Sequence, residues 1–105
     1  RENAALATLE QKKQHKLAQV SRQEQEVAAL STEISGLSSK VSSLKQGSRQ
    51  QQEGAAALEQ RQHDLQKASS ALQAQPDSAA KQQKILQLRE ELRKLEEEAE
   101  YLSNL

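Results

Sequence analysis

Leucine, isoleucine and valine recur along this chain at alternating spacings of three and four residues. The alternation starts at Leu6 and reaches Leu72 without a change of phase. Of the 13 Leu, Ile and Val residues in this interval, 12 fall on the alternation and only Leu17 does not. This is the heptad signature of a helix that packs along one apolar seam, as in a coiled coil. The pattern therefore predicts a long helix.

The two seam positions of each heptad differ in side-chain shape. The first holds the β-branched residues Val20, Val27, Ile34 and Val41, and the second holds mostly leucine. Parallel two-stranded coiled coils prefer this distribution. We therefore predict an all-α fold in the form of an extended coiled coil, parallel and two-stranded, with its tightest pairing between positions 27 and 44.

A window at residues 45–54 weakens the seam. It contains Gly47 and Gly54, and each glycine costs roughly 1 kcal/mol in a helix interior relative to alanine. The heptad phase nevertheless survives, because Leu44 and Leu58 lie two heptads apart. A flexible loop would have no reason to preserve the phase, so we expect a continuous but soft helix through this window.

Pro76 is a stronger interruption, since proline breaks a helix interior and the next two residues, Asp77 and Ser78, are good N-caps. A second seam follows in a phase that does not continue the first. We expect two segments, a long coiled-coil helix over 1–75 and a second coiled-coil helix over 76–105. The predicted dimer interface consists of Leu6, Leu9, Val20, Val27, Leu30, Ile34, Leu37, Val41, Leu44, Leu58, Leu65, Leu72, Ile85, Leu88, Leu92, Leu95 and Leu102.

Several polar residues bear on the choice of partner. Lys13, Lys16 and Gln23 occupy seam positions, where polar side chains select a register or a partner at a cost in stability. In a parallel homodimer, Lys40 would also face Lys45 of the other chain and repel it. These residues leave two partners open, a second copy of the chain in a parallel homodimer or a complementary coiled-coil chain.

A compact alternative is a helical hairpin or three-helix bundle that acts as a protein-binding module. Its turns would lie between Gly47 and Gly54 and at Pro76. The length suits three helices, but this alternative gives no reason for the retained heptad phase.

The composition excludes several further classes of protein and of binding partner. The 105 residues carry zero net charge and one aromatic side chain, and they include no Cys, Met, Phe or Trp. An ordinary globular core needs bulkier side chains, and disulfides or thiolate zinc sites need cysteine. A nucleic-acid binder shows a basic footprint, and a membrane span needs about 20 apolar residues. We therefore expect no nucleic acid, membrane insertion or small molecule among the partners.

Few side chains in the sequence are candidates for catalysis or metal binding. On a continuous helix His15 and His63 would lie about 70 Å apart, which makes two solvated surface histidines the expected arrangement. The acidic run Glu96–Glu100 fans around the helix axis, so it predicts a solvated face rather than a metal site. The sequence contains no phosphate-binding loop, catalytic triad or HExxH motif. We expect no enzymatic activity, no cofactor and no metal.

The heptads resemble the rods of cytoskeletal, centriolar, ciliary, kinetochore and vesicle-tether proteins. The resemblance covers the whole chain and rests on seam spacing alone. It implies a structural segment that dimerises and acts as a spacer or scaffold in a larger, cytoskeletal or centrosomal protein. It also favours an intracellular location, in the cytoplasm or cytoskeleton. Because the chain opens with Arg1, we expect it to be a piece of a longer protein.

Overall fold

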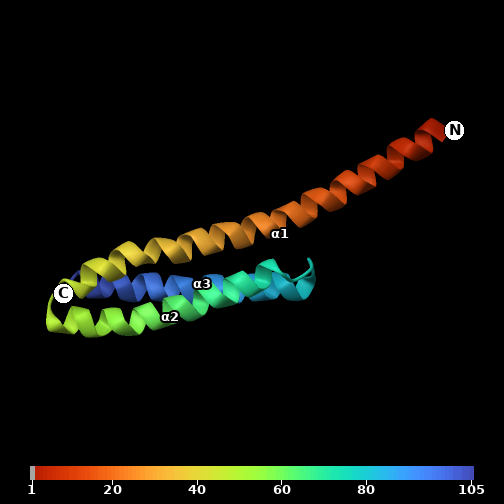
Figure 1. The fold of residues 1–105 in the computed structure, drawn as a ribbon. Helices are drawn as coiled ribbons and strands as arrows, with labels where there is room; N and C mark the ends of the chain where they lie inside the picture. The colour runs from red at the N-terminus through yellow and green to blue at the C-terminus, as the bar shows by residue number, and fades with distance from the viewer. Residues whose placement is uncertain (1) are drawn as a thin grey trace.

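A computed structural model describes residues 2–105 of the chain, with the side chains of residues 7–9, 11 and 22–105. This part of the chain forms three helices and no strand (Figure 1). They are α1 (Glu2–Lys45), α2 (Arg49–Gln73) and α3 (Ala79–Ser103). The all-α prediction is confirmed, and so is the predicted break at Pro76, which lies in the loop between α2 and α3.

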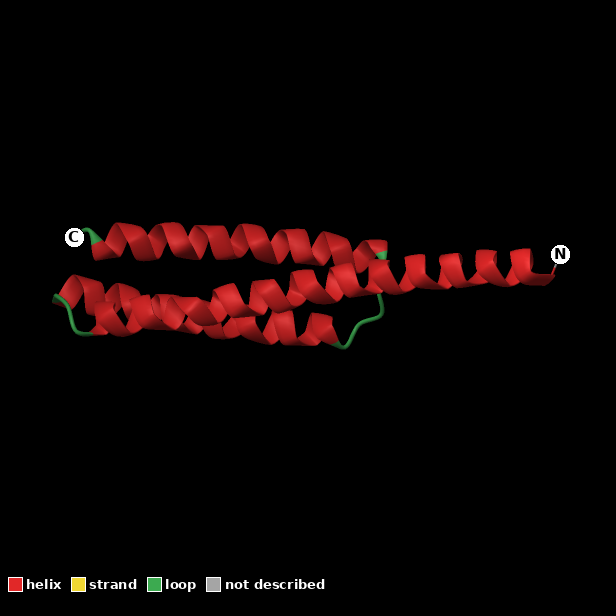
Figure 2. Ribbon diagram, turned by 90° about the horizontal axis from the view of Figure 1, so that it is seen from above, coloured by secondary structure: helices red, strands yellow, loops and turns green. Residues whose placement is uncertain are grey.

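The three helices lie side by side as a bundle in which the chain reverses direction twice (Figures 1 and 2). Helix α2 runs antiparallel to both neighbours, so α1 and α3 are parallel. Helix α1 is the longest and continues past the ends of the other two (Figure 1). The molecule measures 74 × 19 × 16 Å, whereas 105 residues in one helix would span about 150 Å. The prediction of an extended rod is therefore wrong.

The prediction of a continuous helix through residues 45–54 is also wrong. Helix α1 ends at Lys45, and α2 begins at Arg49 after three intervening residues. Ser48 caps α2, because its side chain accepts a hydrogen bond from Gln51 N while the Gln51 side chain accepts one from Ser48 N at 2.9 Å. This capping box satisfies two backbone donors at the helix start and replaces the helical bonds that an unbroken helix would have made.

The apolar seam forms the core of this bundle. At most 6% of each of 13 predicted interface residues is exposed, namely Val27, Leu30, Ile34, Leu37, Val41, Leu44, Leu58, Leu65, Leu72, Ile85, Leu88, Leu92 and Leu95. Leu102 is half-buried against the same core. These side chains contact other helices of their own chain, because the fold-back brings the three seams together. Pairing of the seam with a second chain stays a prediction.

Polar residues on the seam of α2 tie the three helices to one another. Ser69 is fully buried, and its hydroxyl shares a hydrogen bond with that of Ser31 in α1. Gln62 Nε2 donates to the backbone oxygen of Ile34 at 2.7 Å, and Gln51 Nε2 donates to that of Leu102 at 2.9 Å. Buried polar groups with matched partners favour one register over its alternatives. These bonds therefore help to select the folded-back arrangement.

Charged residues near the turn between α1 and α2 are paired within the chain. Lys40 Nζ lies 3.0 Å from Glu100 Oε2 in α3, and Lys45 forms an ion pair with Glu59 in α2. The fold-back thus gives both lysines acidic partners, whereas a parallel homodimer would have set them against each other. Each exposed pair contributes little to stability by itself.

Candidate functional site

The most distinctive part of the surface is the end of the bundle at which α1 leaves the other two helices. We call it the exit end, and it comprises residues 22–26 of α1, the loop 74–78 and residues 79–82 of α3. Figure 1 shows α1 continuing beyond this loop, while the C-terminus lies at the opposite end of the bundle beside the turn between α1 and α2. The direction of the projecting part of α1 is set here.

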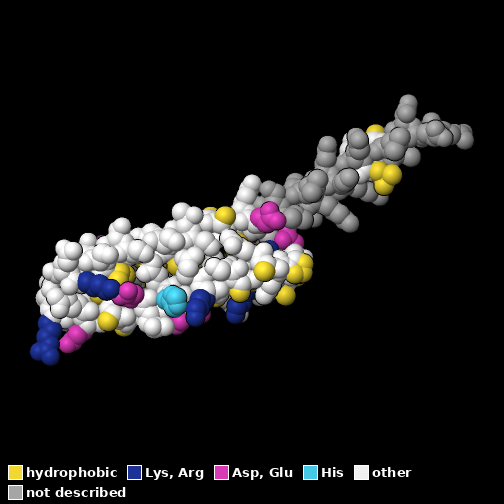
Figure 3. All heavy atoms as spheres, viewed as in Figure 1, with side chains coloured by type: hydrophobic (Ala, Val, Ile, Leu, Met, Phe, Trp, Pro, Cys, Tyr) yellow, Lys and Arg dark blue, Asp and Glu magenta, His cyan; other side chains and the backbone are white. Residues whose placement is uncertain are grey.

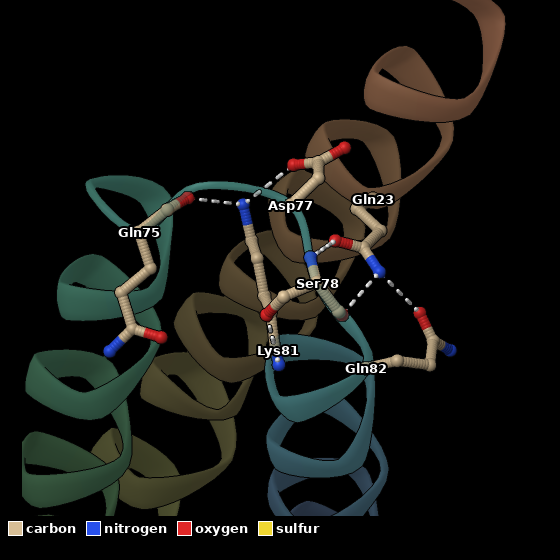
Figure 4. Close-up of polar contacts among 6 residues, drawn as sticks. All are labelled: Gln23, Gln75, Asp77, Ser78, Lys81 and Gln82. Carbon is tan, nitrogen blue, oxygen red and sulfur yellow. Dashed lines mark hydrogen bonds and ion pairs between the residues drawn. The ribbon is translucent and has the colours of Figure 1, made fainter. Parts of the chain in front are cut away.

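Gln23 fastens α1 to the start of α3 (Figure 4). Its Oε1 accepts a hydrogen bond from Ser78 N at 3.3 Å, and its Nε2 donates to Ser78 O at 3.1 Å and to Gln82 Oε1 at 3.2 Å. Ser78 also caps α3, as its position after Pro76 predicted, by accepting from Lys81 N at 3.0 Å. The polar seam residue Gln23 is thereby held by the loop and by the first turn of α3 of the same chain.

Lys81 stabilises the same loop from inside the bundle. Only 1% of its surface is exposed, and its Nζ donates to Gln75 O at 3.0 Å and lies 3.2 Å from Asp77 Oδ1 (Figure 4). A buried ammonium group is costly unless it is paired and hydrogen-bonded. The loop supplies both partners, so Lys81 and the loop hold each other in place.

An open pocket of about 420 Å³ adjoins these contacts. Arg22, Glu26 and Asp77 are among its lining residues. One carboxylate oxygen of Glu26 and one of Asp77 are buried without a hydrogen-bond partner. Both carboxylates thus keep one hydrogen-bond acceptor unused next to this pocket. Among the residues that the structure describes, no group of three or more His, Asp or Glu side chains could hold a metal ion.

The projecting part of α1 carries the remaining interface residues predicted from the sequence. Leu9 is 64% exposed. The side chains of Leu6 and Val20 lie outside those that the structure describes, as do those of the seam lysines Lys13 and Lys16. The bundle therefore brings together the predicted seam from Val27 onward, whereas Leu9 lies outside its core.

The rest of the described surface is polar and mixed in charge. On the face shown in Figure 3, acidic and basic side chains lie close to one another and apolar side chains form only small separate spots. A hydrogen bond from Arg93 lowers the pKa of Glu90, and the reciprocal bond raises the pKa of Arg93. A hydrogen bond from Lys40 likewise lowers the pKa of Glu100. His63 is exposed, as predicted.

Sequence reasoning missed the role of Lys81, although a signal was present. Lys81 lies four residues before Ile85 and thus on the extrapolated seam of α3. A lysine on a seam predicts either a weak helix end or a buried partner, and the acidic partner, Asp77, lies one helical turn earlier. The missing information was the path of the loop, because Gln75 O reaches Nζ only after the chain reverses.

The comparisons with known proteins add no relative. No protein-family model matches this chain, and neither a curated protein nor a solved structure matches it. Within the described residues, no helix has a stretch both long and apolar enough to cross a bilayer.

Proposed function

We propose that this chain is a structural protein-interaction module in which a short three-helix bundle presents the N-terminal part of α1 to a helix of another chain. The observation that supports this proposal is the continuation of the heptad seam past the exit end. Leu6, Leu9 and Val20 keep the phase of the buried residues Val27 and Ile34. Apolar side chains at that spacing are suited to packing against a partner helix.

The bundle gives the projecting helix a fixed origin. An isolated helix of about 20 residues is only marginally stable in water. Here the same helix continues from the part of α1 that is packed against α2 and α3, so it does not have to nucleate on its own. The hydrogen bonds of Gln23 to Ser78 and Gln82 fix the position along α1 at which this helix separates from the bundle. A helix that is ordered before binding loses less entropy when a partner arrives.

The partner that we propose is a second copy of this chain, paired in parallel through the projecting helices. Such a dimer would hold two bundles side by side and act as a spacer or scaffold in a larger assembly. The shared seam is short and contains Lys13 and Lys16, so we expect association at high micromolar concentrations rather than a tight dimer.

Sedimentation equilibrium of the full chain tests this proposal. The wild type is expected to form a reversible dimer, and the variant L6E/L9E/V20E is expected to stay monomeric, because glutamates at seam positions repel across the interface. Q11E is the matched control, since Gln11 is exposed and lies on the outer face of the same helix segment. A dimer that persists in the triple variant, in chains that have not been unfolded and refolded, would contradict the proposal.

A second candidate partner is a helix with acidic residues on its seam. It is favoured by Lys13 and Lys16, whose ammonium groups would face one another in a homodimer but could pair with carboxylates of a different chain. The variant K13L/K16L separates the two candidates. If self-pairing is the function, this variant tightens a dimer that the wild type already forms. If the lysines select an acidic partner, only the variant dimerises.

A further inference from the structure

The heptad phase continues unchanged through the turn between α1 and α2. Steps of three and four residues lead from Val27 through Leu44 to Leu58 and Leu72. Among the side chains that the structure describes in the two helices, every buried hydrophobic residue lies on this count. A hairpin does not require this, because each of its helices can bury its own seam in any phase. The loop between α2 and α3 does shift the phase. A phase retained across a turn is what a single continuous helix would need.

The backbone of the turn has no feature that prevents it from becoming helical. Residues 46–48 include no proline, and no described residue has a positive φ. Ser48 has a φ of −64°, which is a helical value, and departs from the helix through its ψ of 168°. Pro76 in the other loop lacks an amide hydrogen and cannot be absorbed into a helix in this way. Of the two turns of the bundle, only the one at residues 46–48 can therefore become part of a continuous helix.

Local contacts at Gln51 keep the first turn closed. This side chain forms the capping box with Ser48 and also donates to Leu102 O at 2.9 Å. It fits because residue 47 is glycine, since a Cβ at that position would lie 2.0 Å from Gln51 Oε1. Helix propensity also favours closure, because Gly47 would weaken a continuous helix. The remaining contacts of α1 with α2 and α3 are side-chain contacts that a second copy can supply identically.

We propose that two copies of this chain exchange their α1 helices by opening at residues 46–48. Each α1 then continues straight into its own α2 and packs on the α2 and α3 of the partner. The hydrogen-bonded pairs Ser31–Ser69 and Ser38–Gln62 are each centred on residue 50, so the two long helices would cross there antiparallel on a two-fold axis. Exchange of an identical element is a low-cost route to a dimer, because all of its contacts are made again.

The glycine at the turn makes the proposal testable. G47A displaces the capping side chain of Gln51 and favours a continuous helix by roughly fivefold per chain, so the exchanged dimer should gain about 25-fold in its association constant. G36A is the matched control. A Cβ at Gly36 would meet nothing within 4 Å, and this position is helical in both forms, so the association constant should not change.

A second variant is expected to act in the opposite direction. Arg49 is the first residue of α2, where proline is tolerated, and Ser48 before it already has the extended backbone that a following proline requires. The same proline inside a continuous helix would clash with the preceding turn. R49P should therefore leave the folded monomer intact, as judged by circular dichroism, and abolish the exchanged dimer.

The direct experiment combines sedimentation equilibrium with a spin-label distance. Each chain is unfolded in urea and refolded at high concentration, so that exchange can reach equilibrium. Because the sequence contains no cysteine, A28C and S70C place two labels on exposed positions of α1 and α2, and an excess of unlabelled chain suppresses distances between chains. The dimer of G47A should show an intrachain distance of about 63 Å, against roughly 20 Å in the monomer.

Three results would overturn the exchange. They are a G47A chain that remains folded and dimerises no more than the wild type, an R49P chain that dimerises equally well, or a G47A dimer in which the label distance stays short. The last result would indicate pairing through the projecting helices, as in the proposed function. The exchanged dimer does not use Leu6, Leu9 or Val20. A long distance in the G47A dimer therefore supports the exchange whatever the triple variant L6E/L9E/V20E does, and loss of the dimer in that variant, in chains that have not been unfolded, supports the proposed function alone.

Discussion

At the scale of single residues, the polar members of the heptad seam determine how this chain folds. Gln23, Gln51, Gln62 and Ser69 would each weaken a two-stranded interface, yet each finds a hydrogen-bond partner in another helix of the same chain. A polar group of this kind that is buried without a partner destabilises the fold by more than its hydrogen bond would stabilise it. The residues that weaken the seam as a coiled coil therefore specify the bundle.

Lys81 gives the sharpest prediction at this scale. K81M keeps the length and apolar stem of the side chain but leaves Gln75 O and the Asp77 carboxylate without their cation, so we expect a loss of about 1–3 kcal/mol in the free energy of unfolding. Urea denaturation measures this loss. The control K84M removes an exposed lysine one turn away and should change the free energy by less than about 0.5 kcal/mol. Equal effects in the two variants would contradict the structural role of Lys81.

The ion pair between Lys40 and Glu100 predicts a pH dependence. Lys40 lowers the pKa of Glu100 below its ordinary value of 4.5, so the folded state holds this proton less tightly than the unfolded state does. The pair therefore adds stability above the ordinary pKa, and this contribution is lost as the pH falls through the lowered pKa.

We expect K40M to return the pKa of Glu100 toward 4.5, as measured by a carboxyl NMR titration, and to reduce stability at neutral pH but not at the acid end of the titration. The control K67M removes a lysine of α2 and should leave the pKa of Glu100 in place. An unchanged Glu100 pKa in K40M would show that the pair does not persist in solution.

At the scale of elements, the three glycines differ in the space that surrounds them. Gly36 lies in an open part of α1, Gly47 makes room for a capping side chain, and Gly54 makes room for Leu102 of α3. A Cβ at residue 54 would lie 2.4 Å from Leu102 Cδ1. The sequence shows that each glycine weakens a helix, but only the fold shows which of them another element needs.

A double-mutant cycle tests the contact between α2 and α3. G36A should stabilise the chain by about 0.5–1 kcal/mol through helix propensity. G54A should lack most of this gain, because the new methyl group displaces Leu102. In an L102A background G54A should recover it. Thermal unfolding of the four chains measures the coupling, and a G54A gain that is the same with and without Leu102 would contradict the packing described for this pair.

At the scale of the whole molecule, the sequence predicted the all-α fold and the core residues, but it favoured the wrong arrangement because it joined α1 and α2 into one helix. The heptad count identifies the side chains that are buried, because burial of one stripe is common to a coiled coil and a bundle. It does not distinguish a stripe buried by another chain from one buried by the same chain. The retained phase across Gly47 favoured a continuous helix, and the capping box at Ser48 with Gln51 outweighed it.

The exit end was the least predictable part. The hydrogen bonds of Gln23 with Ser78 and of Lys81 with Gln75 join residues that only the reversal at Pro76 brings together. All three bonds use a backbone atom of the loop, which carries no sequence signal. The Lys40–Lys45 repulsion expected between parallel chains was the clearest hint of the fold-back, since it implied that each lysine needed a different neighbour.

The central claim is that one chain folds back on itself and buries its own seam. Small-angle X-ray scattering, extrapolated to a concentration at which the chain is monomeric, tests it most directly. The bundle predicts a radius of gyration close to the 19.5 Å of its Cα atoms and a maximum dimension close to 74 Å. A radius near 45 Å with a maximum dimension of about 150 Å would be that of an unbroken helix, and would contradict the account.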